Sequence, residues 1–292
     1  MTVNPPRRDL PPRSALDRFI RRFQHVSHFV AVLALYAIAA LALGIALAPA
    51  LWLIDRARTI AAPLAAWGHW LVLGIGAGAA IFVFGFALLV VVAVFNWVLP
   101  TRIGEFHGSY YTAAAVPWFV HNALFYLVRF TFLPFVTMTP IGLWFLRAMG
   151  MKIGAGTMIN TEYLSDVNLL TLGEKVAVGG SVRIFAHYAG AGRLTIVPVV
   201  IGDRVTLGLG CTVMGDVIIG DDATILAHSV LLPGSRVGEG EVWGGVPAKP
   251  IPREDLERVK MEIRGLRIRE DPSAGAVGLV PPPAFSGEPV KE

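Results

Sequence analysis

The sequence predicts a membrane α-helical hairpin followed by an all-β domain, a left-handed parallel β-helix, which is closed by a C-terminal helix. Three observations support this. Uncharged apolar runs occupy residues 28–54 and 70–99. From Ile201 onward, every sixth residue is apolar as far as Trp243. Only 16% of the residues are charged, against about 25% in an ordinary globular domain, and the apolar excess lies before Gly150.

Residues 1–27 form a basic segment that carries much of the net charge of +4. Lys and Arg beside a span favour the cytoplasmic side of the membrane. We therefore expect a cytoplasmic tail, location in the inner (cytoplasmic) membrane, and return of the chain to the cytoplasm after two spans. We do not expect nucleic acid as a partner. Cys211 is alone, so no disulfide framework is expected.

Residues 28–99 are predicted to form two transmembrane helices. A hydrocarbon core about 30 Å thick requires about 20 helical residues, and both runs exceed that length. The first run is also too long for the apolar core of a cleavable signal peptide. Tryptophans fall near the ends of the runs, as expected for anchors in the membrane interface: Trp52, Trp67, Trp70 and Trp97.

Residues 100–150 are predicted to be interfacial or re-entrant helices that seat the following domain on the bilayer. The segment from Tyr110 to Leu146 is rich in aromatic residues, but it contains Arg129 and several prolines. A straight span with a central arginine would be costly. A third full span remains the alternative, and it would place the following domain outside unless the N-terminus is also reversed.

Residues 151–252 contain the repeat. A period of six matches neither a simple strand nor a helix, and it is typical of a β-helix with three short strands in each coil. The period breaks between His187 and Ile201, so we expect a loop to protrude there, where function often concentrates. The apolar positions that follow the period are Ile153, Ile159, Leu172, Val178, Ile184, Ile201, Leu207, Val213, Ile219, Ile225, Leu231, Val237 and Trp243.

Two segments follow the repeats. Residues 253–270 alternate charged and apolar residues in a helical pattern, and residues 271–292 are rich in proline and glycine. We expect a C-terminal helix that packs along the β-helix and then a disordered tail.

The hexads and the stretch Trp243-Gly-Gly-Val-Pro-Ala-Lys-Pro-Ile251 resemble the hexapeptide-repeat acyltransferase superfamily over about residues 151–252. The resemblance implies an acyl-CoA-dependent transferase that forms a homotrimer and binds its donor between subunits. It also assigns cofactor-binding roles to Gly244, Gly245, Pro247 and Lys249.

Three groups related to this superfamily resemble the chain in different ways. Sugar O-acetyltransferases place their catalytic histidine at the position held here by Gly210. Xenobiotic acetyltransferases carry theirs just before a protruding loop, where His187 stands. The layout is also similar to a single copy of the membrane-embedded C-terminal repeat of poly-amino-acid (poly-lysine-type) synthetases.

His187 is the candidate catalytic base. Acyl transfer from a thioester requires a group that takes the proton from the incoming hydroxyl or amine, and histidine titrates near neutral pH. A structural role, in which the ring bonds the loop backbone, is the alternative. A catalytic imidazole is usually oriented by an acceptor, for which Asp166 is the better candidate and Glu162 the other.

Two corner glycines and a second histidine complete the predicted site. We expect the backbone amides near Gly208 and Gly210 to be free and to admit the pantetheine arm of the donor. His228 stacks one coil beyond Gly210, where it has either a structural role or a place in the groove.

The sequence thus predicts a membrane-anchored acyltransferase that acts on a membrane- or envelope-associated hydroxyl or amine acceptor. A non-catalytic trimeric β-helix scaffold of a membrane biosynthetic complex is the alternative, because position 210 lacks a histidine. A zinc site of the γ-carbonic-anhydrase type requires three histidines, and the repeats hold only His187 and His228, so no metal is expected.

Overall fold

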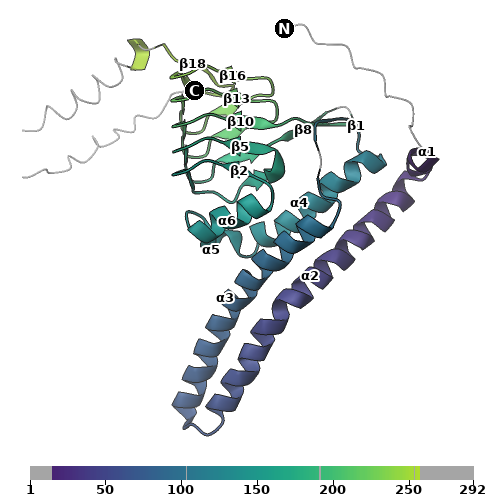
Figure 1. Ribbon diagram of the computed structural model, residues 1–292, viewed down its shortest axis with the longest axis vertical. Helices are drawn as coiled ribbons and strands as arrows, with labels where there is room; N and C mark the ends of the chain where they lie inside the picture. Colours follow the sequence, from purple (N-terminus) through teal and green to yellow (C-terminus); the bar gives the residue numbers. More distant parts are fainter. Residues whose placement is uncertain (1–14, 103, 191, 253, 257–292) are drawn as a thin grey trace, which may run out of the picture. The chain divides into compact units, whose positions relative to one another are not determined.

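The computed structural model describes residues 15–102, 104–190, 192–252 and 254–256. Helix α1 (Ala15–Arg22) leads into α2 (Gln24–Ala61), which a short turn joins to α3 (Ala66–Val98) as a helical hairpin (Figure 1). At a rise of 1.5 Å per residue, the 38 residues of α2 extend about 57 Å. Both long helices are apolar and long enough to cross a membrane. Helix α2 begins before the predicted start at residue 28.

Small residues let the two long helices approach closely. The buried residues of α2 are all alanines, and a Cβ added to Gly76 of α3 would collide with the Cβ of Ala57. Small residues at the contact are typical of helices that pack in a bilayer. The large apolar side chains of the hairpin, such as Phe29, Leu51 and Ile75, are mostly exposed instead.

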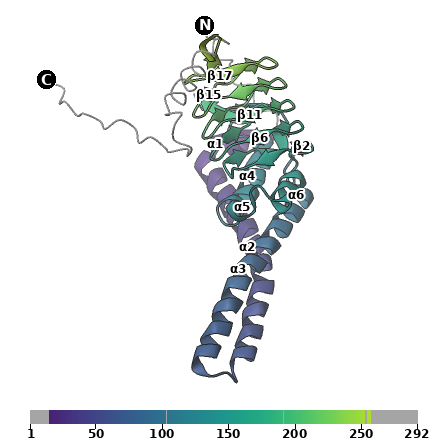
Figure 2. The ribbon, with the colours of Figure 1, turned by 90° about the vertical axis from the view of Figure 1, so that its left-hand side faces the viewer.

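Three short helices lie between the hairpin and the first coil of the β-helix: α4 (Val116–Arg129), α5 (Leu133–Val136) and α6 (Pro140–Ala148), preceded by the 3-10 turn η1 (Ala113–Ala115) (Figure 2). None has the roughly 20 residues that a span requires. The structure thus contains no third full span between residues 110 and 146.

Arg129 explains how this aromatic segment accommodates a charge. Its side chain turns toward the β-helix, where Nη1 donates to the carbonyl oxygen of Leu164 at 3.4 Å. The guanidinium also lies over the rings of Tyr126 and Tyr163.

The repeats form three parallel sheets. One contains β2 (Lys152–Ile153), β5 (Leu170–Leu172), β10 (Val199–Ile201), β13 (Ile218–Ile219) and β16 (Arg236–Val237). The second contains β3 (Met158–Ile159), β6 (Ala177–Val178), β11 (Thr206–Leu207), β14 (Thr224–Ile225) and β17 (Val242–Gly244), with β18 (Lys249–Pro250) antiparallel to β17. The third contains β4 (Leu164–Ser165), β7 (Arg183–Phe185), β12 (Thr212–Val213) and β15 (Val230–Leu231).

The strand register confirms the predicted parallel β-helix. Ile153 lies beside Leu172, which lies beside Ile201, and the stack continues through Ile219 to Val237. These are the positions that the six-residue period selects. Their side chains are buried or nearly so, and they form one continuous core with the buried apolar residues of α4 and α6.

The predicted loop is a β-hairpin. Strands β8 (His187–Gly190) and β9 (Arg193–Ile196) leave the coil and pair antiparallel. Strand β1 (Phe106–Ser109), from the segment between α3 and α4, pairs with β9 as a third strand. The period of the repeats gave no sign of β1.

The ends of the chain lie largely outside the described residues. Of the predicted helix at 253–270, residues 254–256 are described and are helical. Most of that helix, the tail at 271–292 and residues 1–14 lie outside the described part.

Cys211 is expected to be chemically inert in the folded protein. Burial raises the pKa of its thiol to about 12, and a buried thiol is a poor nucleophile. A maleimide reagent should therefore leave the native protein unlabelled and label it once denaturant is added. As a control, Leu209→Cys places a thiol at a residue whose side chain is 54% exposed, and it should react without denaturant. Rapid labelling of native Cys211 would contradict the buried core described here.

Candidate functional site

Asp166 is a charged residue buried at the centre of the candidate site. It follows β4 at a corner of the first coil and has a φ of 55°, a left-handed conformation that aspartate tolerates better than most residues. Its side chain is completely buried. A buried charge is costly unless it is hydrogen-bonded, so its partners decide whether it remains ionised.

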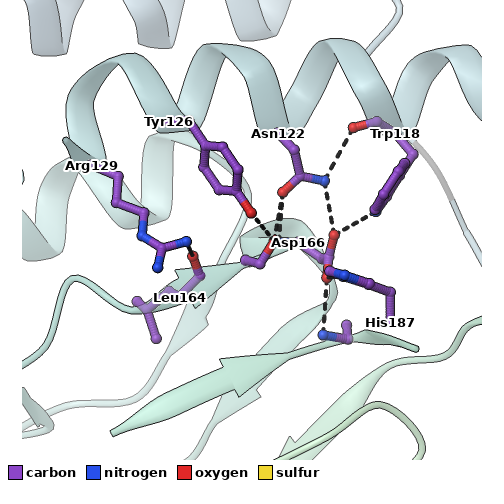
Figure 3. A network of polar contacts seen from close by, with 9 residues as sticks. Trp118, Asn122, Tyr126, Arg129, Leu164, Asp166 and His187 are labelled. Atoms are coloured by element: carbon purple, nitrogen blue, oxygen red, sulfur yellow. Dashed lines mark hydrogen bonds and ion pairs between the residues drawn. The ribbon is translucent and has the colours of Figure 1, made fainter. Parts of the chain in front are cut away.

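Both carboxylate oxygens of Asp166 accept two hydrogen bonds (Figure 3). Oδ1 accepts from the indole Nε1 of Trp118 at 2.6 Å and from Nδ2 of Asn122 at 2.9 Å. Oδ2 accepts from the backbone amide of Ala186 at 3.0 Å and from Nδ1 of His187 at 2.6 Å. Burial raises the pKa of this carboxyl group. The hydrogen bonds from His187, Asn122 and Trp118, with the charge of His187, outweigh burial and lower the pKa below its usual value.

His187 lies at the start of β8, one coil beyond Asp166, because β7 pairs with β4. Its side chain is 25% exposed. An ionised Asp166 can only accept, so Nδ1 of His187 carries a proton, and whenever the ring is neutral its Nε2 has a free lone pair. The indole of Trp118 meets the imidazole edge-on, with ring centroids 5.1 Å apart. This tautomer is the one that a general base requires.

Helix α4 contributes the other half of the network. Trp118 and Asn122 are four residues apart and so share one face of the helix. The amide oxygen of Asn122 accepts from Oγ of Ser165 at 2.8 Å and from the backbone amide of Asp166 at 3.2 Å. Tyr126 extends the same face, with its hydroxyl 3.3 Å from Oγ of Ser165.

Sequence reasoning missed these helix residues. The signal was the spacing Trp118, Asn122, Tyr126, which places hydrogen-bonding groups on one face of an otherwise apolar helix.

Removing the amide of Asn122 is expected to weaken the site. In Asn122→Ala, Oδ1 of Asp166 loses a donor, and the hydroxyl of Ser165 loses its acceptor, which costs about 1–3 kcal/mol for a buried group. The melting temperature in detergent should fall, and His187 should be held less firmly. Asn160, an exposed residue of the repeats, supplies the control: Asn160→Ala should melt within the error of the unchanged protein. Equal melting of both variants would show that the contact with α4 contributes little.

The alternative orienting residue, Glu162, is half-buried and does not take the place of Asp166 at the His187 ring. Of the two predicted partners, it is therefore Asp166, and not Glu162, that bonds the His187 ring. The catalytic roles of His187 and Asp166 remain predictions.

The expectation of free amides at Gly208 and Gly210 is wrong. The Gly208 amide donates to the carbonyl of Ile225 at 2.8 Å, and that of Gly210 to the carbonyl of Gly180 at 2.9 Å. Stacked coils use these corner amides for pairing, so the amides are not available to a pantetheine arm. A Cβ added to Gly210 would lie 2.7 Å from Nδ1 of His228, which occupies the corner directly above. His228 itself is exposed.

The last coil ends in a tight antiparallel pair. Gly244 lies opposite Lys249, and Gly245, with a φ of 96°, donates its amide to Oγ of Ser229 at 3.2 Å. Pro247 lies in the turn between them. Lys249 is exposed, so its ammonium group is available to an anion. A contact of these residues with a cofactor remains a prediction.

No group of three or more His, Cys, Asp or Glu side chains in the described part of this chain is arranged to hold a metal ion.

Comparison with known proteins agrees with the geometry of the coils. Residues 198–240 match the family model "Bacterial transferase hexapeptide (six repeats)". We call the coils of residues 151–252 the hexapeptide-repeat domain. Residues 198–240 of this domain resemble bacterial hexapeptide-repeat transferases.

Individual relatives resemble the hexapeptide-repeat domain at moderate identity. Delta-poly-L-ornithine synthetase of Acinetobacter baumannii is 28% identical over 116 residues, which cover 39% of this chain and 9% of that protein. Gamma carbonic anhydrase 2 of Arabidopsis thaliana mitochondria is 32% identical over 119 residues, which cover 34% of this chain and 42% of that protein. The match therefore spans less than half the length of each relative.

Among solved structures, a hexapeptide-repeat acetyltransferase from Vibrio cholerae in complex with acetyl coenzyme A is similar to this chain. The identity is 25% and the TM-score 0.33, over 35% of this chain and 60% of that one.

Proposed function

We propose that this protein is a membrane-anchored acyltransferase that moves an acyl group from acyl-CoA to a hydroxyl or amine of a membrane- or envelope-associated acceptor. The observation that carries the proposal is the buried, fully hydrogen-bonded Asp166 and its short bond to Nδ1 of the partly exposed His187. A carboxylate that fixes the tautomer of an accessible imidazole is the arrangement that general-base catalysis requires.

In the proposed reaction, Nε2 of His187 takes the proton of the acceptor hydroxyl or amine as the oxygen or nitrogen attacks the thioester carbonyl. Asp166 stabilises the imidazolium that forms. When the tetrahedral intermediate collapses, the carbon–sulfur bond breaks and the thiolate of coenzyme A leaves. The imidazolium returns its proton to that thiolate, which restores the neutral ring.

Support for a membrane location comes from the elements that hold the site. Helix α4, which supplies Trp118 and Asn122, packs against α3 of the apolar hairpin. Around α5 and α6 a set of large apolar side chains is exposed, as expected for a surface that lies in the membrane interface: Phe130, Phe135, Met138, Ile141 and Trp144. The acceptor would meet His187 beside the bilayer, and the basic N-terminal segment favours a cytoplasmic hexapeptide-repeat domain.

The resemblance to hexapeptide-repeat enzymes supports two further parts of the proposal. The chain would assemble as a homotrimer, with acyl-CoA between neighbouring subunits. Lys249 and the turn from Gly244 to Pro247 would lie at the nucleotide end of the donor, since an exposed ammonium suits phosphate groups.

The proposal is tested by measuring thiol release from acetyl-CoA by the full chain in lipid nanodiscs, with n-dodecylamine as the acceptor. We expect acceptor-dependent release that saturates with acetyl-CoA, and acetylated amine by mass spectrometry. If acetyl-CoA and longer acyl-CoA produce no thiol release and no rise in melting temperature, the result would count against the enzyme and favour the scaffold. A separate assay of CO₂ hydration with added zinc covers the relationship to carbonic anhydrases, and activity there alone would overturn the proposal.

A further inference from the structure

We propose that a pocket between α2 and α4 binds the alkyl chain of the acyl acceptor, which makes the acceptor a lipid-class amphiphile. This inference rests on the proposed function for the role of the bound molecule, but the pocket itself does not depend on catalysis. The family model assigns no site to these helices, because it matches residues 198–240.

The pocket has a volume of about 560 Å³, within the range of about 300–1,000 Å³ typical of small-molecule sites. Its walls are almost entirely apolar. They are formed chiefly by α2, by the residues just after α3 and by the first turns of α4, and include Val32, Leu35, Ile38, Leu99, Phe119 and Val120.

The pocket is also lined by side chains that carry a polar group: Ser27, His28, Tyr110, Tyr111 and Thr112. Oγ of Ser27 is inaccessible to solvent and has no hydrogen-bond partner in the described part of the chain, although an unpaired buried hydroxyl is unfavourable. From Ser27 to Ile38, α2 advances about 16 Å. An extended alkyl tail would fill this apolar length.

The pocket is connected to the catalytic pair through two adjacent residues of α4. Phe119 forms part of the pocket wall, and its ring lies 4.8 Å from that of Trp118. The ring of Trp118 contacts His187, and its indole Nε1 bonds Asp166. Occupation of the pocket therefore acts on the side chain that holds the pair in place.

The position of the pocket favours the acceptor over the donor as its occupant. Helix α2 supplies much of the wall, and its other face exposes large apolar residues, among them Phe29, Val30, Leu33 and Tyr36. A molecule dissolved in the bilayer would reach the pocket from the side of this helix. Acyl-CoA carries a large charged nucleotide, and the hexapeptide-repeat domain offers that nucleotide the exposed Lys249.

Two valines of α2 give a matched pair of variants. Val32 lines the pocket and is half-buried, whereas Val30 is 58% exposed and lies outside it. Val32→Trp fills the pocket, and Val30→Trp adds the same ring to the outer face. Nanodiscs containing each variant are irradiated with a diazirine-bearing dodecylamine, and labelled peptides are identified by mass spectrometry. The same labelling is repeated in His187→Ala, which separates binding from turnover.

We expect label on residues 27–38 and 110–120 in the unchanged protein, in Val30→Trp and in His187→Ala. Val32→Trp should lose about tenfold or more of this label, since displacing even two methylene groups from an apolar site costs about that factor. The ratio of kcat/KM for dodecylamine to that for ethylamine should fall in Val32→Trp and hold in Val30→Trp.

Equal labelling of the two tryptophan variants would overturn the inference. Protection of the pocket by decanoyl-CoA, with a shift of acyl-chain preference in Val32→Trp, would also overturn it by making the donor the occupant. Labelling without any turnover would leave the pocket standing and remove the proposed enzyme. Turnover with equal labelling and equal substrate preference in Val32→Trp and Val30→Trp would leave the proposed enzyme standing and remove the pocket.

Discussion

Replacement of His187 with alanine is expected to lower the rate of acyl transfer by about 10²–10⁴-fold, the contribution that a positioned general base makes. The imidazole supplies the lone pair that receives the acceptor proton, and Asp166 cannot replace it because its carboxylate is completely buried. The measurement is kcat for thiol release at saturating acetyl-CoA and acceptor. The rise in melting temperature with acetyl-CoA should persist, since donor binding does not require this ring.

His107 provides the matched control. It lies on β1 of the same three-stranded sheet and is exposed. Ile196 lies beside both His187 and Phe106, whereas His107 lies beside Thr195. Because successive residues of a strand point to opposite faces, His107 and His187 point to opposite faces of the sheet. His107→Ala should keep the full rate. A full rate in His187→Ala would remove the catalytic assignment and favour the scaffold.

Replacement of Asp166 with asparagine is expected to have the second largest effect. The change keeps the shape of the side chain and removes its charge, so the imidazolium that forms during transfer loses its stabilising partner. The introduced amide nitrogen would also face donors, since Trp118, Asn122, His187 and the Ala186 amide all donate to this group. We expect kcat to fall by up to about 10⁴-fold, the loss that the same change causes in a Ser-His-Asp triad.

The same variant should also be less stable. Each buried donor left unpaired costs about 1–3 kcal/mol, so the melting temperature should drop clearly. Asp216→Asn is the control, because Asp216 is also an aspartate at a left-handed corner, with a φ of 65°, but it forms an exposed pair with Arg236. Surface pairs contribute about 0–1 kcal/mol. Equal loss of stability in both variants would contradict the special role of the buried carboxylate.

The pH dependence of stability provides a further check on Asp166. Its pKa in the folded protein lies below the ordinary value of 3.8, so the folded state favours the ionised form. The resulting stability is fully present above the pKa of the unfolded chain and is lost as the pH falls through the folded pKa. The protein should therefore lose melting temperature below about pH 4, more steeply than Asp166→Asn. If the melting temperatures of the unchanged protein and of Asp166→Asn fall in parallel as the pH is lowered, other carboxyl groups cause the acid transition.

The parts of the structure that repeat were predictable from sequence. A six-residue period places one apolar residue on each face of each coil, and the stacking of these residues fixes the strand register. Of the two predicted partners of His187, the sequence favoured Asp166, and the structure pairs these two residues at 2.6 Å. The break in the period also indicated where the chain leaves the scaffold.

The parts of the site that depend on distant segments were not predictable. Trp118 and Asn122 bond a carboxylate that lies 48 and 44 residues further along the chain, and no local pattern encodes that contact. The pairing of β1 with β9 is equally non-local. The error at Gly208 and Gly210 has a different cause. Because glycine has no side chain, its amide was expected to be free at a corner. Instead, the Gly208 amide donates to the coil above and the Gly210 amide donates to the coil below.

A double-mutant cycle on His187 and Asp166 tests the central claim most directly, namely that the two residues act as one catalytic unit. The rates of thiol release are compared for the unchanged protein, His187→Ala, Asp166→Asn and the double variant. If Asp166 acts only through the imidazole, the double variant should be no slower than His187→Ala, because residues that work as a unit are strongly non-additive. A double variant slower by the product of the two single effects would show independent roles and contradict the account.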